Sequence, residues 1–120
     1  MHVTLTKSFD FHAAHALGTF PEGHRCRNMH GHTFRVDIIV SGEVDPRKGY
    51  LVDFGEIREL TRPIEQKLDH AVLNEIEGLE IPTAEMLAKW VYDQLAPDLP
   101  QLEAIRIHET PNNTAEYRGG

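Results

Sequence analysis

The chain has 120 residues, of which 40% are hydrophobic and 26% charged, and its formal net charge is −7. This length predicts a single domain over residues 1–120 with one hydrophobic core, and an acidic chain without a basic stripe argues against nucleic-acid binding. No apolar run reaches the ~20 residues of a membrane helix and the first residues do not resemble a signal peptide, so we expect a cytoplasmic protein.

Two segments in the first third of the chain alternate apolar and polar residues. Apolar side chains favour odd positions over residues 3–11 and even positions over residues 34–40. A period of two predicts half-buried β-strands. Between them, residues 17–24 contain two glycines and a proline, which predicts a loop. A turn rich in Gly, Pro and Asp follows the second strand and leads to a short extended segment at residues 50–52.

Two amphipathic helices occupy the middle of the chain. Asp53 is a good N-cap, Glu56 lies in capping-box register, and apolar residues follow at helical spacing as far as Leu68. Pro63 falls inside this pattern and predicts one bent helix. Thr83 is the expected N-cap of the second helix, which ends before the sequence "APDLP".

Two further strands are predicted at residues 103–109 and 113–119, with a turn between them. The element order is therefore ββααββ, which indicates an α+β fold with a four-stranded antiparallel sheet. Two helices can cover only one face of such a sheet. Its open edges have to be protected or paired with another chain, so we expect an oligomer.

The sequence "HGH" at the start of the second strand suggests half of a metal site. His30 and His32 share a face at a period of two, and His15 follows the first strand. Antiparallel pairing of the two strands would bring His15 beside them. Three imidazoles suit Zn²⁺ with one open coordination position. The alternative is that each histidine is merely solvated or hydrogen-bonded.

The chain's only cysteine, Cys26, has three possible roles. It could be a fourth zinc ligand, a thiolate base or nucleophile beside the metal, or an inert core residue. Its neighbours His24, Arg25 and Arg27 argue against the inert role, because cationic groups favour a thiolate. Structural zinc sites usually contain two or more cysteines, so a single one favours an open, catalytic metal with a separate thiol.

Three further residues are candidates for acid–base chemistry or ligand binding. Asp69 and His70 are adjacent in sequence, and their direct pairing would need an irregular backbone. The simpler interpretation is that they end the first helix. Glu109 continues the apolar face of the third strand, where a carboxylate needs a partner. A ligand with paired N–H donors would provide one.

Six motifs in order resemble one known family. "FDFHAAH", "CRNMHGH", "VDFGEI", "LDHAVLN", "PTAE" and "HET" together resemble the pterin synthases of the tunnelling fold, the 6-pyruvoyltetrahydropterin synthase family. The match extends from Phe9 to Gly119. The three residues between Cys26 and His30 resemble the branch that makes 6-carboxytetrahydropterin for queuosine biosynthesis.

The resemblance implies an architecture and a set of site residues. Three sheets would join edge to edge in a barrel, and two trimers would stack into a homohexamer with active sites between subunits. The implied substrate is a small pterin, 7,8-dihydroneopterin triphosphate, and the implied cofactor is Zn²⁺. The implied zinc ligands are His15, His30 and His32; the implied catalytic residues are Cys26, Asp69 and His70; and the implied pterin-binding residues are Glu109, Thr83 and Ala84.

Two alternative functions remain open at this point. The chain could belong to the branch that makes 6-pyruvoyltetrahydropterin, or it could be a zinc-stabilised binding module without catalysis. The triphosphate-binding residues have no motif, and Arg25, Arg27 and His24 are candidates by charge alone.

Overall fold

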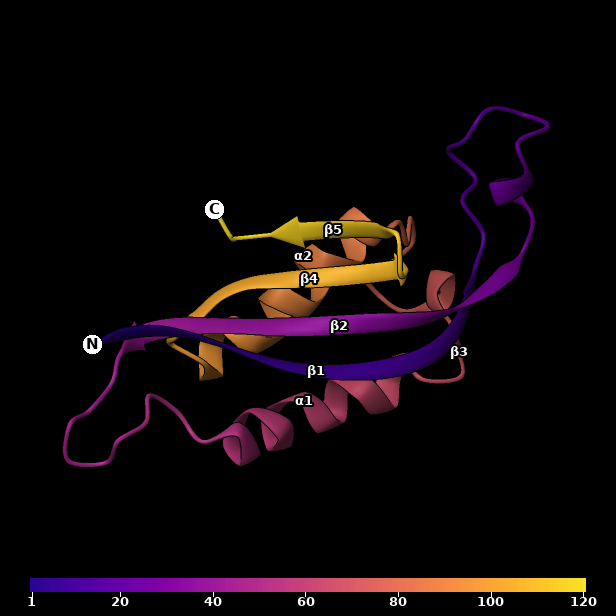
Figure 1. Ribbon diagram of the computed structural model, residues 1–120. Coiled ribbons are helices and arrows are strands. Elements are labelled where there is room, and N and C mark those ends of the chain that lie inside the picture. The colour runs from indigo at the N-terminus through magenta and orange to yellow at the C-terminus, as the bar shows by residue number, and fades with distance from the viewer.

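The computed structural model describes residues 1–120 and confirms the α+β class (Figure 1). Two helices pack on a five-stranded sheet whose strand order is β3-β1-β2-β4-β5. The elements are β1 (His2–His15), β2 (His30–Glu43), α1 (Phe54–Leu68), β3 (Ala71–Val72), α2 (Ala84–Leu95), β4 (Leu102–Thr110) and β5 (Asn113–Tyr117). The sequence predicts four strands, so β3 is an addition.

Strand β3 is short and parallel to its neighbour, unlike the rest of the sheet. Ala71 and Val72 pair with Ala13 and Ala14 of β1. The strand directly follows His70, whose φ of 60° turns the chain sharply after α1. A strand of two residues is too short to show an alternating pattern of apolar and polar side chains. The sequence therefore does not predict it.

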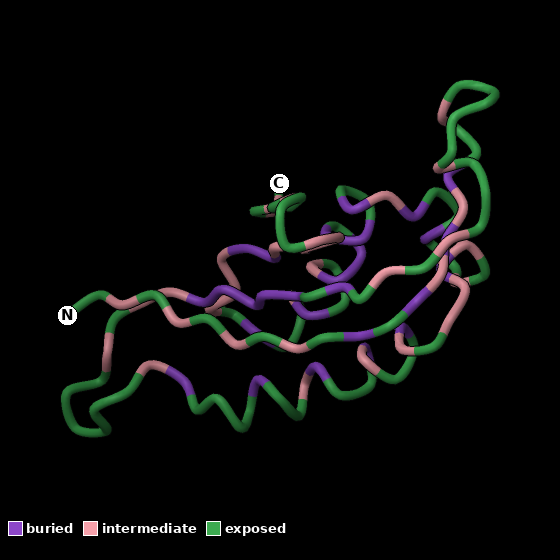
Figure 2. Tube along the Cα trace, turned by 45° about the vertical axis from the view of Figure 1, so that its right-hand side comes forward, coloured by how far each residue is buried: buried purple, intermediate pink, exposed green.

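One face of the sheet forms the core with both helices. Phe34, Val36, Ile38 and Val40 alternate along β2 and are fully buried. Each such side chain contributes about 2 kcal/mol when it leaves water. A single core cluster joins them to apolar residues of α1 and α2, and Figure 2 shows the buried segments gathered between the sheet and the helices. The two helices therefore cover the same face, as predicted.

The opposite face of the sheet carries polar side chains and no helix. We call it the open face. Directly paired residues of antiparallel strands share a face, and the pairs Ser8 with Asp37 and His12 with Thr33 define it. Polar residues on this face of β1, β2 and β4 include Ser8, Asp10, His12, Thr33, Arg35, Asp37, Arg106 and His108.

Both helices begin at the predicted caps. Asp53 Oδ1 accepts a hydrogen bond from the Gly55 N–H at 2.8 Å, and Thr83 Oγ1 accepts one from the Met86 N–H at 3.2 Å. Helix α1 continues without a break through Pro63. Neither helix is long and apolar enough to cross a membrane.

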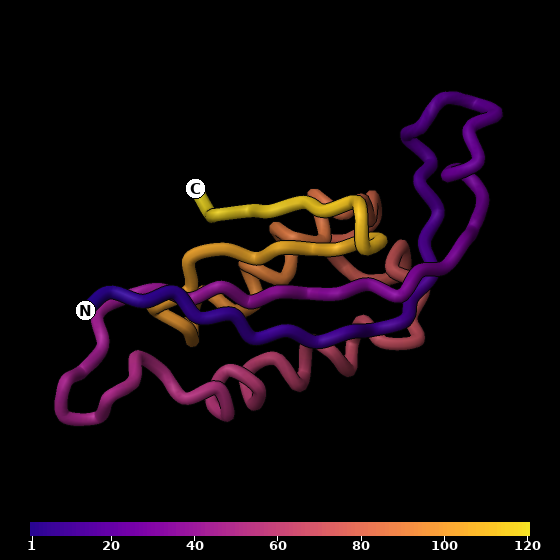
Figure 3. Tube along the Cα trace, viewed as in Figure 1, coloured from indigo at the N-terminus to yellow at the C-terminus, as the bar shows by residue number.

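The two long connections extend beyond opposite ends of the sheet (Figure 3). The extended segment predicted at residues 50–52 is not a strand, since only an isolated bridge pairs Tyr50 with Asp45. The connection between β1 and β2 contains one turn of 3₁₀ helix, Arg25–Arg27. This connection carries Cys26 and leads into the histidines.

Candidate functional site

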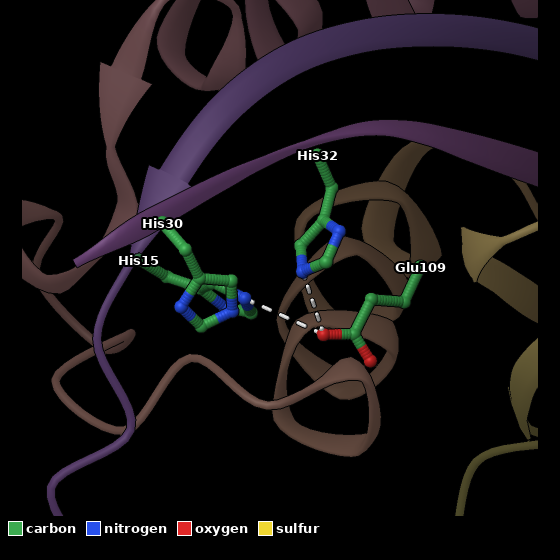
Figure 4. A group of neighbouring side chains, drawn as sticks. All are labelled: His15, His30, His32 and Glu109. Carbon is green, nitrogen blue, oxygen red and sulfur yellow. Dashed lines mark ion pairs between the residues drawn. The ribbon is translucent and has the colours of Figure 1, made fainter. Parts of the chain in front are cut away.

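Three histidine rings converge at one end of the sheet, on the face that the helices cover. His15, the last residue of β1, pairs with His30 at the start of β2, and His32 pairs with Ala13. The ring centroids lie 4.6 to 5.2 Å apart. Figure 4 shows the three rings gathered around Glu109. The antiparallel pairing thus brings together the imidazoles that the sequence groups.

Backbone carbonyls fix the tautomers of two of these rings. His15 Nδ1 lies 2.8 Å from Pro82 O, and His30 Nδ1 lies 2.7 Å from Asn28 O. A carbonyl oxygen only accepts, so each Nδ1 carries a proton, and in the neutral form of the ring Nε2 keeps its lone pair. Burial lowers the pKa of His15, although its bond to Pro82 opposes the shift. Neutral imidazoles held in this way are ready metal ligands.

Glu109 completes a group of four potential ligands. Its Oε1 lies 3.4 Å from His15 Nε2 and 3.2 Å from His32 Nε2. One ligand atom from each of Glu109 and the three histidines falls within 4.8 Å of all the others. Glu109 also lines a hollow of about 610 Å³ with Ala84. Glu109 is thus the only one of the four residues that lines this hollow, whose other walls come from the start of α2 and from residues 112–116.

The chemistry of this group fits a divalent metal ion. His15 Nε2 and His32 Nε2 are buried and have no hydrogen-bond partner, which is costly for polar atoms. A cation bound between the rings would satisfy both lone pairs. We conclude that these residues could hold a metal ion.

Cys26 lies outside this group. It sits in the 3₁₀ turn, half-buried and not in a disulfide. Its N–H donates to His24 Nδ1 at 3.1 Å, and its carbonyl accepts from the Leu17 N–H at 2.9 Å. The sulfur is not among the four clustered ligand atoms. This placement leaves the thiol available for a role other than metal binding.

Two of the three basic candidates for triphosphate binding are engaged within the same connection. Arg27 Nη1 donates to the carbonyls of Gly18 and Phe20, both at 2.7 Å. The ring of His24 stacks on Phe20 at 4.3 Å. Arg25 has no comparable contact, so it is the freer of the two arginines to meet an anion.

Asp69 and His70 form the direct pair that an irregular backbone permits. His70 Nδ1 lies 3.0 Å from Asp69 Oδ2. The other oxygen, Oδ1, accepts from the His12 N–H at 2.9 Å, and the His70 N–H donates to His12 O at 2.6 Å. The bond from the His12 N–H is the main reason that the pKa of Asp69 is lowered, although partial desolvation opposes it.

The acid–base pair and the metal-binding group lie on opposite faces of the sheet. His70 packs edge-on against His12 at 6.0 Å between centroids, and His12 bonds Thr33 across the open face. The neighbouring pair of His15 and His30 points to the helix face instead. Within one chain, His70 shares a hollow of about 530 Å³ with His32, whereas His15, His30 and Glu109 do not line it.

The start of α2 borders the metal-binding group. Pro82 O holds His15, Thr83 caps the helix and Ala84 is buried at 9% exposure. Ala84 lines the same hollow as Glu109, whereas the hydroxyl of Thr83 is used by the cap. Ala84 therefore borders this hollow, and Thr83 precedes Ala84 in the chain as the helix cap.

Several supporting groups are invisible to motif reading. The carbonyls of Pro82 and Asn28 orient two histidines, and a backbone carbonyl carries no residue-type signal. The Asn74 side chain accepts from Ala16 N and donates to Ala16 O, at 2.9 and 2.8 Å. It anchors the chain directly after His15. Asn74 ends the motif "LDHAVLN", but that motif alone predicts no anchoring role for it.

Comparisons with known proteins place these observations in a family. The family model described as "6-pyruvoyl tetrahydropterin synthase" matches residues 4–120. The 6-carboxy-5,6,7,8-tetrahydropterin synthase of Synechocystis sp. is 35% identical, covering 92% of this chain and 89% of that protein. A putative 6-carboxy-5,6,7,8-tetrahydropterin synthase of Archaeoglobus fulgidus is 32% identical, covering 92% and 91%.

A solved structure extends the similarity to the whole fold. The 6-pyruvoyl tetrahydropterin synthase of Caenorhabditis elegans superposes with a TM-score of 0.92 at 26% sequence identity. The superposition covers 100% of this chain and 97% of that one.

Proposed function

The chain belongs to the 6-pyruvoyl tetrahydropterin synthase family, and from this premise we propose that it is a 6-carboxy-5,6,7,8-tetrahydropterin synthase. It would convert 7,8-dihydroneopterin triphosphate and water to 6-carboxytetrahydropterin, acetaldehyde and triphosphate, in queuosine biosynthesis. The observation that carries the proposal is the group of His15, His30, His32 and Glu109 beside a hollow of about 610 Å³. The relatives named above support the carboxy product.

The proposed metal is Zn²⁺, held by His15, His30 and His32. Three neutral imidazoles leave a coordination position open. When bound, Zn²⁺ would supply Lewis-acid chemistry to side-chain oxygens of the substrate. In that state Glu109 would be free to accept N–H donors of the pterin ring through its carboxylate. Ala84 and Thr83 would line the same pocket.

The proton transfers are assigned to the remaining groups. Cys26 thiolate would remove a proton from the substrate side chain, and His70 would deliver or accept the partner proton. Asp69 holds His70 through Nδ1, so Nε2 is the atom that faces a ligand. The His70 side chain is 79% exposed and therefore accessible to one.

The opposite faces of the two groups support a shared active site. Because His70 lies on the open face and His30 on the helix face, we infer that a second chain brings its Asp69–His70 pair to the metal of the first. We propose a homohexamer built as a dimer of trimers, in which such sites form between subunits.

Product analysis tests the proposed reaction. Incubation with 7,8-dihydroneopterin triphosphate should release acetaldehyde together with triphosphate. Release of triphosphate without acetaldehyde would identify the 6-pyruvoyl branch instead.

Chelation tests the alternative of a zinc-stabilised binding module. A non-catalytic module that depends on zinc should unfold when the metal is removed. Here the apolar core does not include the metal-binding histidines. We expect the metal-free protein to keep its helical circular dichroism, to lose turnover and to regain it with added Zn²⁺.

A further inference from the structure

The open face contains a buried carboxylate that the proposed reaction does not use. Asp37 on β2 is 8% exposed. Ser8 Oγ on β1 donates to its Oδ1 at 2.6 Å, and His108 Nε2 on β4 lies 2.7 Å from its Oδ2. One carboxylate thus links three adjacent strands on the face opposite the metal-binding group.

The link between Asp37 and His108 is a strong one. A buried carboxylate needs partners for both oxygens, and here both have one. An ionised carboxylate can only accept, so His108 Nε2 donates to it. Hydrogen bonds to ionised acceptors are shorter and stronger than neutral ones. The pair therefore fastens β4 to β2 at one defined point.

This point is where the ladder between the two strands stops. Arg35 with His108 is the last pair of β2 and β4 at that end. On the other side of β4, His108 pairs with Thr114 and Thr110 with Asn113, so Glu109 is the unpaired residue of a bulge. Bulges of this kind redirect a side chain next to active sites.

We propose that His108 and Asp37 are positioning residues that hold the end of β4, so that Glu109 stays between the histidines and the hollow. Consecutive strand residues point to opposite faces, so His108 can anchor the backbone while Glu109 points to the site. The inference rests on the proposed function, in which Glu109 binds the pterin ring. Loss of the pair should weaken ring binding and leave the proton-transfer groups in place.

A purely structural role for the pair is the alternative, and the same face offers a matched control. Arg35 Nε donates to Asp10 Oδ1 at 3.1 Å, joining β2 to β1 on the open face. Neither residue of this ion pair lines the hollow beside Glu109. Asp10→Asn should therefore perturb the open face without moving Glu109.

The experiment measures kcat and KM for 7,8-dihydroneopterin triphosphate in the zinc-loaded protein, together with Tm. His108→Ala should raise KM about tenfold with little change in kcat, since it removes binding common to ground and transition states. His108→Gln keeps an N–H donor of similar reach and should restore most of the loss. Asp10→Asn should leave KM unchanged, whatever its effect on Tm.

Two results would overturn the inference. One is an unchanged KM in His108→Ala. The other is an Asp37→Asn/His108→Ala double variant whose KM exceeds that of His108→Ala, because residues that act through one link should not add.

Neopterin separates failure of this inference from failure of the proposed function. Its binding, followed by fluorescence, reports ring recognition without turnover. Should the wild type give no product, the proposed function fails. Neopterin affinity should still be about tenfold weaker in His108→Ala than in the wild type if the inference holds. Equal affinities would overturn it independently of the reaction.

Discussion

His70 Nδ1 lies 3.0 Å from Asp69 Oδ2, although adjacent residues of a regular helix point in different directions. The pair forms because His70 adopts a φ of 60°, the only positive φ among the non-glycine residues. Such a conformation costs of order 1 kcal/mol. The same turn ends α1 and starts β3, so the acid–base pair is built into the fold.

His70→Asn tests whether that turn serves catalysis. Asparagine tolerates the left-handed region better than most residues, so Tm should not fall. Loss of the imidazole should reduce turnover by about 10²–10⁴-fold. Steady-state kinetics and thermal unfolding measure the two effects. His12→Asn is a matched control, since His12 is the neighbouring ring on the same face and should be nearly silent. Turnover within tenfold of wild type in His70→Asn would contradict the assignment.

Cys26→Ala separates the thiol from the metal. Cys26 lies outside the clustered ligand atoms, so the variant should retain its metal, measured as ions per chain by mass spectrometry. Its turnover should fall at least 100-fold if the thiolate is the base. Cys26→Ser provides a conservative control, with a weaker acid of similar size. Loss of the metal from Cys26→Ala would indicate a closed structural site.

Asp37 makes stability depend on pH. Burial alone would raise the pKa of Asp37, but hydrogen bonds from Ser8 and His108 outweigh it and lower that pKa below its usual value. A carboxyl with a depressed native pKa stabilises the fold above its unfolded value of about 3.9, and that contribution disappears as pH falls through the native pKa. The Tm difference between wild type and Asp37→Asn should therefore have its maximum size near pH 6 and become smaller below about pH 4. A difference that stays constant down to pH 2 would count against this account.

Subunit mixing tests whether the acid–base pair acts on a neighbouring chain. Cys26→Ala and His70→Asn should each be inactive alone. After the two are unfolded and refolded together in equal amounts, about a quarter of wild-type activity should return, since one intersubunit site in four receives both intact groups. If Cys26 and His70 of one chain served the same site, mixing would restore nothing.

The sequence predicts more of the site than of the sheet. His15 meets His30 because β1 and β2 pair antiparallel along their whole length, which joins their near ends. For Asp69 and His70 the residues alone favour the end of a helix, and the catalytic pair is implied only by the family resemblance. Strand β3 is not predicted, because its two residues reach β1 only after the turn at His70. No local sequence pattern indicates that turn.

Other features depend on three-dimensional proximity alone. From the alternating pattern of its strand, Asp37 is expected to be a solvated polar residue. The structure shows instead that it is buried and bonded to Ser8 and His108. The shared face of Glu109 and Ile107 is visible in the period of two. Its approach to His32 at 3.2 Å is not, because it depends on the bulge at the end of β4.

The most direct test is the stoichiometry of products from 7,8-dihydroneopterin triphosphate with the zinc-loaded wild-type protein. Acetaldehyde, triphosphate and 6-carboxytetrahydropterin should appear in equal amounts, measured by chromatography and an aldehyde-reducing coupled assay. Triphosphate release without acetaldehyde, or no turnover of this substrate by the metal-loaded protein, would contradict the proposed synthase.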